Sequence, residues 1–324
     1  MKTQCLVVNP WNPEGPVLEE ATGILRRGGL VAFPTETVYG LGANGLDASA
    51  VTAIYRAKGR PSDNPLILHV SSPLEAEPLA FLDARSRALM SAFWPGPLTL
   101  VLPSRPIVPF ETRGGLDSVA LRMPDHPVAL ALIDRVGVPL AAPSANLSGR
   151  PSPTDASAVL FDLGGRIDLV LDAGPVSVGV ESTVIGLCDE TPLLLRAGGT
   201  AKEDIEDFLG VPLQIPNEES SRRSPGTRYR HYAPFVPVLV WKPPEPCTCP
   251  APQIWGYLGL TPPPLPFARV VLFESLGNYA RGLFAGFRLM EKEGLEGVVV
   301  QWPSGEGIGL ALRDRIRRAA AVGS

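Results

Sequence analysis

Polar and charged residues gather where short apolar runs end, and their types suit the binding of an anionic ligand. Thr35-Glu36-Thr37 follows the apolar run 29–33 inside a glycine-rich turn, and Lys58 and Arg60 flank the flexible Gly59. Two cations held this close repel each other unless an anion is near. The spacing therefore predicts a phosphate or carboxylate partner for Lys58 and Arg60, with solvated surface charge as the alternative.

A third cluster and a single arginine extend this pattern. Ser144 and Asn146 follow the apolar run 138–140, and both can hydrogen-bond phosphate or adenine, although an ordinary Ser or Asx turn would use the same residues. Arg122 follows the apolar run 119–121, where an unpaired buried charge would cost several kcal/mol. We therefore expect Arg122 to meet an anion.

Motifs of the common nucleotide-binding and hydrolytic enzymes are missing from the sequence. It has no Gly-x-x-x-x-Gly-Lys-Ser/Thr loop and no Gly-x-Ser-x-Gly elbow, and its three histidines are not at zinc-ligand spacing. A nucleotide would have to be held by other means. Four carboxylates are candidates for a general base, and their spacing does not choose among them: Glu36, Asp47, Asp172 and Glu181.

The clusters need a scaffold, and residues 1–210 are predicted to provide it as a mixed α/β domain. Apolar runs such as 168–172 alternate with amphipathic stretches. Several predicted helices begin near residues of N-cap type, among them Asp83, Asp125 and Thr154. The predicted helices are 17–27, 48–57, 83–93, 126–136, 154–163 and 202–209.

The pattern changes after residue 210. Residues 211–234 include a polar, turn-rich stretch and are predicted as a linker, and residues 235–324 as a small α/β domain with a parallel sheet. The predicted strands are 236–241, 253–258, 269–273 and 297–301, and the predicted helices 279–292 and 309–320. Proline runs at 243–246 and 262–264 prevent helices there, so one side of this sheet should lack them.

Composition favours a globular protein with two cores. The chain of 324 residues exceeds the usual single-core size, with 45% hydrophobic and 19% charged residues. The net charge of −4 disfavours a stand-alone tRNA-binding module, because the surface as a whole does not attract polyphosphate strongly. Without a signal peptide or a membrane-spanning apolar run, and with four scattered cysteines, we expect a cytoplasmic protein with no membrane contact.

Taken together, the clusters resemble the threonylcarbamoyl-AMP synthases of the YrdC-like family. The motifs stand in a consistent order: 33–42, Lys58 with Arg60, 93–99, 122–124, 143–146, 179–183 and Arg196. Residues 225–234 resemble the linker of the longer, two-domain form of that family. The resemblance implies an open twisted mixed sheet with a concave basic cleft, followed by a small Rossmann-like parallel α/β domain.

The resemblance also implies an activity. L-threonine, bicarbonate and ATP as substrate would give threonylcarbamoyl-AMP and pyrophosphate, with Mg²⁺. Downstream threonylcarbamoyl transferase proteins would then modify the adenosine beside the anticodon, so that tRNA is an indirect partner.

Site residues follow from the resemblance position by position. Those implied for L-threonine are Thr35, His69, Arg122, Ala142 and Ser182. Those implied for ATP are Lys58, Arg60, Asn64, Ser118, Ser144, Asn146, Ser152, Arg196 and Tyr232. Lys58 and Arg60 are the predicted catalytic cations, the linker is implied to fold over the site, and the metal ligands are left open.

Two other classes of function are alternatives to a threonylcarbamoyl-AMP synthase. An RNA-binding maturation factor without ATP chemistry could use the same basic face, although the acidic net charge disfavours it. A carbamoyl-transfer domain of hydrogenase maturation proteins has a related fold. Those proteins carry paired-cysteine zinc motifs and an acylphosphatase segment, and the sequence contains neither.

Overall fold

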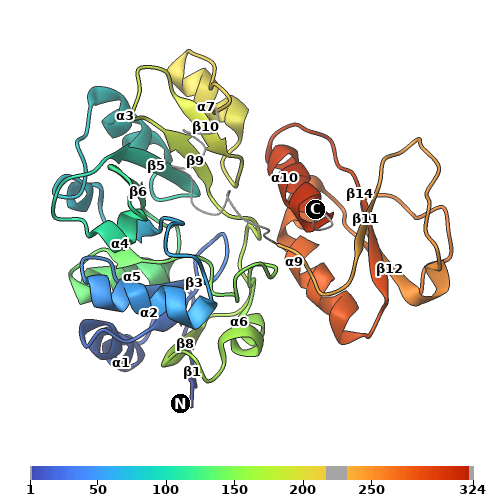
Figure 1. The fold of residues 1–324 in the computed structure, drawn as a ribbon, viewed down its shortest axis with the longest axis horizontal. Coiled ribbons are helices and arrows are strands. Elements are labelled where there is room, and N and C mark those ends of the chain that lie inside the picture. Colours follow the sequence, from blue (N-terminus) through green and yellow to red (C-terminus); the bar gives the residue numbers. More distant parts are fainter. Residues whose placement is uncertain (1, 217–231, 321–324) are drawn as a thin grey trace.

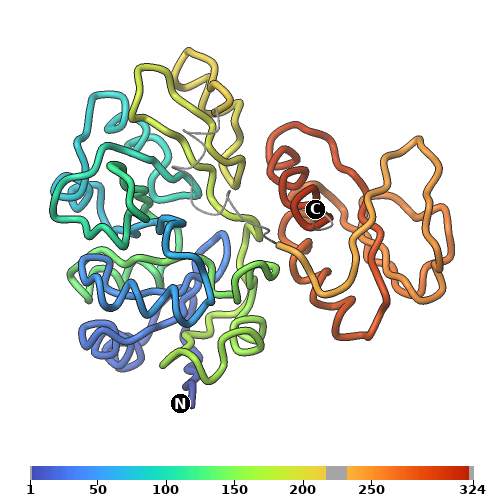
Figure 2. Tube along the Cα trace, viewed as in Figure 1, coloured from blue at the N-terminus to red at the C-terminus, as the bar shows by residue number. Residues whose placement is uncertain are grey.

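The computed structural model of the chain describes residues 2–216 and 232–320. Figure 1 shows two bodies, a larger one built around an extended sheet and a smaller one whose helices α9 and α10 lie between its own sheet and the larger body. The trace in Figure 2 runs through the larger body first and then through the smaller one. Most of the predicted linker lies outside the described residues.

The larger body contains a ten-stranded mixed sheet in the order β1-β8-β2-β3-β7-β4-β6-β5-β9-β10. Its strands are β1 (Gln4–Val7), β2 (Val31–Phe33), β3 (Gly40–Asn44), β4 (Ile67–His69), β5 (Leu98–Pro103), β6 (Ser118–Arg122), β7 (Leu140–Ala141), β8 (Leu169–Asp172), β9 (Thr183–Gly186) and β10 (Leu193–Arg196). The sheet combines parallel pairs such as β4 with β6 and antiparallel pairs such as β5 with β6. The predicted open mixed sheet is confirmed.

All six predicted helices of this body are present, and the short helix α4 (Phe110–Arg113) was not predicted. The six are α1 (Gly15–Arg26), α2 (Ala48–Lys58), α3 (Ala84–Phe93), α5 (Pro127–Val136), α6 (Ala156–Leu163) and α7 (Lys202–Leu209), with a 3-10 turn η1 (Pro73–Ala76). Asp83 caps α3, as predicted. The predicted caps Asp125 and Thr154 are wrong by one residue, because His126 accepts from the N–H of Val128 and Asp155 from that of Ala158.

Helices cover the large sheet unevenly, and this leaves room for a site. One face packs against α2, α3, α6 and α7 through apolar residues such as Ile54 and Leu89. On the other face α1 and α5 cover one half of the sheet. The remaining half buries a small strand cluster around Ile67 and Ala120, and none of the described residues in that cluster belongs to a helix.

The smaller body is a four-stranded parallel sheet in the order β11-β14-β12-β13. Its elements are β11 (Val238–Trp241), η2 (Pro252–Ile254), β12 (Trp255–Gly259), β13 (Arg269–Leu272), α9 (Leu276–Lys292), β14 (Gly297–Gln301) and α10 (Ile308–Ala320). One face of the sheet packs on α9 and α10. The other packs on the proline-rich loops through residues such as Cys247 and Leu265, as the proline runs predict.

The two bodies share a continuous apolar cluster. Val38 and Val180 of the larger body pack with Phe284 and Leu283 of α9. Two ion pairs flank this contact, one joining Arg150 to Glu291 at 2.6 Å and the other Arg288 to Asp162 at 2.8 Å. None of the helices in the described part of the chain combines the length and apolar character needed to cross a bilayer.

Candidate active site

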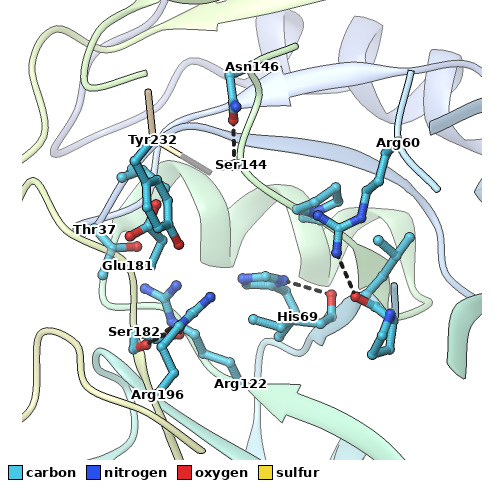
Figure 3. Close-up of a pocket in the computed structure, with 16 residues that line it drawn as sticks. Thr37, Arg60, His69, Arg122, Ser144, Asn146, Glu181, Ser182, Arg196 and Tyr232 are labelled. Carbon is cyan, nitrogen blue, oxygen red and sulfur yellow. Dashed lines mark hydrogen bonds between the residues drawn. The ribbon is translucent and has the colours of Figure 1, made fainter. Parts of the chain in front are cut away.

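A pocket opens on the half of the large sheet that carries no helix. The empty space that it outlines, including open solvent, is about 580 Å³. It is lined by Thr37, Val38, Arg60, Pro65, Leu66, Ile67, His69, Arg122, Ala142, Pro143, Ser144, Asn146, Glu181, Ser182, Arg196 and Tyr232. Figure 3 shows Arg60 on one side, Tyr232 and Glu181 on the other, and His69 with Arg122 and Arg196 between them.

Strand pairing places His69 beside Arg122. The parallel strands β4 and β6 pair these residues at their carboxyl ends, where functional side chains of α/β sheets usually lie. Side chains alternate between the two faces of a strand, so Arg122 shares its face of β6 with Ala120 and Ser118. Ser118 thus faces the same side as Arg122 but at the opposite end of β6, and it does not line the pocket.

Arg122 meets an anion within the protein. Its Nη2 lies 2.7 Å from Oε2 of Glu36, and its Nε donates to the carbonyl of Gly96 at 3.3 Å. Burial, followed by the charge of Arg122, lowers the pKa of His69 to about 3. His69 is therefore neutral at physiological pH, with Nδ1 3.3 Å from the carbonyl oxygen of Ile67.

Arg196 and Ser182 form a second bonded unit of the pocket wall (Figure 3). Arg196 donates from Nη2 to the carbonyl and to Oγ of Ser182, at 2.9 and 3.1 Å. The same hydroxyl lies 2.7 Å from Oγ1 of Thr99 on β5. The predicted nucleotide residue Arg196 and the predicted threonine residue Ser182 are therefore in direct contact.

Lys58 and Arg60 differ in their surroundings. Arg60 lines the pocket and donates to the carbonyls of Asn64 and Pro65, and burial lowers its pKa to about 10, so that it remains a cation at neutral pH. Lys58 lies behind the wall. Its Nζ is 2.5 Å from the carbonyl oxygens of both Ser144 and Asn146, so it holds the loop that carries these side chains.

Burial, followed by the charge of Arg60, lowers the pKa of Lys58 well below its ordinary value. Gly59 explains why the two cations diverge. It adopts φ of 60°, ends α2 and turns the chain between them.

Nine of the predicted site residues line the pocket: Arg60, His69, Arg122, Ala142, Ser144, Asn146, Ser182, Arg196 and Tyr232. Thr35, Lys58, Asn64, Ser118 and Ser152 do not. Thr35 accepts from the N–H of Val38 and lies 2.9 Å from Oγ1 of Thr37, which lines the pocket in its place. Asn64 is buried beside Arg60, and Ser152 donates to the carboxylate of Glu181. The ligand roles of all these residues remain predictions.

Glu181 is the candidate base that reaches the pocket. Asp47 instead caps α2 and Asp172 accepts from the N–H of Gly174, while Glu36 pairs with Arg122 behind the wall. Glu181 also contacts Arg315, a residue of α10 to which no sequence signal pointed. Among the residues that the structure describes, no three His, Cys, Asp or Glu side chains gather as a metal site would require.

Two family models together match almost the whole chain. The model described as telomere recombination, of the Sua5, YciO and YrdC proteins, matches residues 23–198. The model of the C-terminal domain of threonylcarbamoyl-AMP synthase matches residues 200–321.

Similar proteins match this chain over most of its length. The threonylcarbamoyl-AMP synthase of Pyrococcus abyssi is 43% identical over 93% of both chains, and that of Bacillus subtilis is 49% identical over 72% of this chain and 69% of its own. The crystal structure of P. abyssi Sua5 complexed with L-threonine superposes with a TM-score of 0.92 at 41% identity, covering 98% of both chains. The chain belongs to the threonylcarbamoyl-AMP synthase family, in its two-domain form.

Proposed function

We propose that the protein converts L-threonine, bicarbonate and ATP into threonylcarbamoyl-AMP and pyrophosphate. The observation that carries this proposal is the convergence of Arg60, Arg122 and Arg196 on one pocket. Of the described residues that line it, Glu181 is the one carboxylate, and it is already paired with Arg315. Such a wall suits ligands with several negative charges, and every late species of this reaction is an anion.

The threonine subsite lies around Arg122 and His69. Arg122 can hold the amino-acid carboxylate with a planar fork, and the neutral His69 beside it supplies a hydrogen-bonding group without adding charge. Ser182, Ala142 and Thr35 complete the proposed subsite. The relative from P. abyssi, crystallised with L-threonine, supports L-threonine as a ligand.

The nucleotide subsite lies toward Arg60 and the loop 143–148. Its proposed residues are Lys58, Arg60, Asn64, Ser118, Ser144, Asn146, Ser152, Arg196 and Tyr232. Lys58 would act mainly through the carbonyls of Ser144 and Asn146 that it fixes. Tyr232 lies near the end of the predicted linker 211–234, which we propose separates a catalytic domain, 1–210, from a C-terminal domain, 235–324.

The proposed reaction depends more on the alignment of the reacting atoms than on a general acid or base. The amine of threonine attacks bicarbonate-derived carbon and forms a carbamate with loss of water. A carbamate oxygen then attacks the α-phosphorus of ATP, the bond from that phosphorus to the bridging oxygen breaks, and pyrophosphate leaves. Arg60 and Arg196 would stabilise the charge that develops on the phosphates, while Arg122 fixes the nucleophile.

Of the described residues that line the pocket, Glu181 is the one carboxylate that could bind Mg²⁺, and it is already paired with Arg315 and Ser152, while the nearby Glu36 is paired with Arg122. We propose that the ion arrives on the phosphates of ATP, and no step above depends on it. The product would pass to a threonylcarbamoyl transferase that modifies tRNA, in the cytoplasm, where ATP and tRNA are available.

The test is formation of pyrophosphate and threonylcarbamoyl-AMP by the purified protein from ATP, bicarbonate and L-threonine, with L-serine as competing substrate. Arg60→Met should lower product formation at least tenfold, whereas Arg56→Met, on the exposed side of the preceding helix α2, should leave it unchanged. Folded protein that makes no threonine-dependent product and binds RNA with a steep salt dependence would favour the RNA-binding alternative instead.

A further inference from the structure

Arg315 is a fully buried cation next to the pocket, and it belongs to the smaller body, which we call the second domain. It lies on α10 and its exposed fraction is 0%. Its Nη1 lies 2.6 Å from Oδ2 of the neighbouring Asp314, and its Nε donates to Oε2 of Glu181 at 2.6 Å. Glu181 belongs to the larger body, so this bond joins the two bodies inside the protein.

The bond to Glu181 ends in the pocket wall. Glu181 lines the pocket, and its other oxygen accepts from the hydroxyl of Ser152, a residue of the proposed nucleotide subsite. Burial alone would raise the pKa of Glu181, but Arg315 and then Arg196 outweigh it and hold the pKa below its ordinary value. Glu181 is therefore an anion whose orientation depends on Arg315.

Arg315 also faces Tyr232. Its guanidinium carbon lies 5.0 Å from the centre of the tyrosine ring, and Phe284 of α9 stacks on that ring at 5.4 Å. Tyr232 has φ of 67°, which is uncommon for a residue with a side chain and persists only where neighbours hold it. Both of these neighbours belong to the second domain, and Tyr232 lines the pocket.

The other ion pairs described between the bodies lie away from the pocket. Arg150 with Glu291 and Arg288 with Asp162 join residues that do not line the pocket. They can dock the second domain without touching a ligand. Arg315 differs from Arg150 and Arg288 because its partners, Glu181 and Tyr232, line the pocket.

We propose that Arg315 is a positioning residue through which the second domain sets the orientation of Glu181 and Tyr232 for catalysis. This inference rests on the proposed function and deepens it. A buried ion pair is costly to desolvate and contributes little net stability compared with apolar packing, and its best-attested use is to specify one geometry. The second domain then completes the active site as well as packing against it.

The experiment compares Arg315→Met, which keeps the length of the side chain without its charge, with Arg317→Met on the exposed side of the same helix. Steady-state kinetics with ATP and L-threonine should show kcat/KM at least tenfold lower for Arg315→Met and unchanged for Arg317→Met. Adding Glu181→Gln to Arg315→Met removes the unpaired buried charge, and we expect at least a threefold recovery. Arg315→Lys should lie between wild type and Arg315→Met.

The inference would be overturned if Arg315→Met were folded and had the kcat and KM of the wild type. It would also be overturned if Arg315→Met lost activity, the added Glu181→Gln restored none of it, and Arg315→Lys lost as much activity as Arg315→Met. If Arg315→Met does not fold, the comparison rests on Arg315→Lys. If the wild-type protein makes no product, the proposed function is wrong. The inference is then decided by a crystal structure of Arg315→Met, in which a Tyr232 ring still stacked on Phe284 would contradict it.

Discussion

Arg122, which lines the pocket, forms a buried ion pair with Glu36: its Nη2 lies 2.7 Å from Oε2 of Glu36, and the two side chains are 5% and 6% exposed. The pair neutralises a cation at the end of a buried strand. It also fixes the guanidinium in one orientation, because Nε is bound to the carbonyl of Gly96. A ligand carboxylate would therefore meet an arginine that is already positioned.

Arg122→Lys should weaken the binding of L-threonine selectively. Lysine keeps the charge but loses the fork that can hold a carboxylate with two bonds. A hydrogen bond to a charged group contributes about 1.5–3 kcal/mol, so the KM for L-threonine should rise about ten- to hundredfold. The KM for ATP should change less than about threefold. Steady-state kinetics with each substrate varied in turn measures both values.

A matched control for this substitution is Arg135→Lys, since Arg135 is 43% exposed and pairs with Glu19 on the surface. That variant should behave as wild type. An Arg122→Lys protein whose threonine KM is unchanged would show that another residue holds the carboxylate.

Lys58→Met should destabilise the loop that carries Ser144 and Asn146. The substitution leaves the carbonyl oxygens of Ser144 and Asn146 without their hydrogen-bond donor. The free-energy cost of these two unsatisfied oxygens should exceed the free energy gained by no longer burying an ammonium group. We expect a loss of about 2 kcal/mol in the free energy of unfolding, measured by urea denaturation. Lys202→Met, which removes a surface pair with Glu206, should cost less than about 0.5 kcal/mol. Equal stabilities of the two variants would contradict the supporting role of Lys58.

The stability of the protein should fall between pH 7 and pH 5 because of His69. Its pKa is about 3 in the folded protein against an ordinary 6.5, so below pH 6.5 the unfolded chain binds a proton that the folded one does not. Stability then rises with pH in this window, and lowering the pH from 7 to 5 should cost about 2 kcal/mol.

His69→Gln should lose less stability over the same range, and urea denaturation at both pH values gives the comparison. His126, whose pKa burial also lowers, is present in both proteins and cancels in the difference. An identical pH dependence in the two proteins would mean that His69 takes up a proton when folded.

Local features of the fold could be predicted because they depend on neighbouring residues. The periodicity of apolar residues predicted α7 and β14 with their observed bounds. The proline runs predicted that one side of the sheet in the second domain lacks helices. The caps failed where two capping residues adjoin, as Thr154 and Asp155 do. Which of them becomes the cap depends on where the first turn packs, and the sequence alone does not show this.

The parts of the site that depend on distant segments could not be predicted from local pattern. His69 and Arg122 meet only because β4 and β6 pair in one register. Arg315 lies 134 positions from Glu181, on a helix whose arginines all suggest a solvated basic face. The resemblance supplied nine pocket-lining residues, but it could not supply a cation that the second domain contributes.

Gly179→Ala should displace the second domain. A Cβ at this position would lie 2.3 Å from Cα of Arg281 and 2.6 Å from the carbonyl oxygen of Ala280, both in α9, so the helix must move away. Gly174→Ala is the matched control, since Gly174 has a similar φ of 81° and an added Cβ there would meet nothing within 4 Å. In both variants an alanine must adopt a left-handed backbone conformation, which costs about 1–2 kcal/mol. A difference in activity between the two variants therefore reports the contact of residue 179 with α9.

We expect Gly179→Ala to lower kcat/KM at least tenfold relative to Gly174→Ala, because a shift of α9 moves Phe284 away from Tyr232. Kinetics of both variants, with circular dichroism to establish that each is folded, provides the measurement. If the two variants were equally active, the close approach of Gly179 to α9 would be dispensable, and the second domain could move without disturbing the pocket.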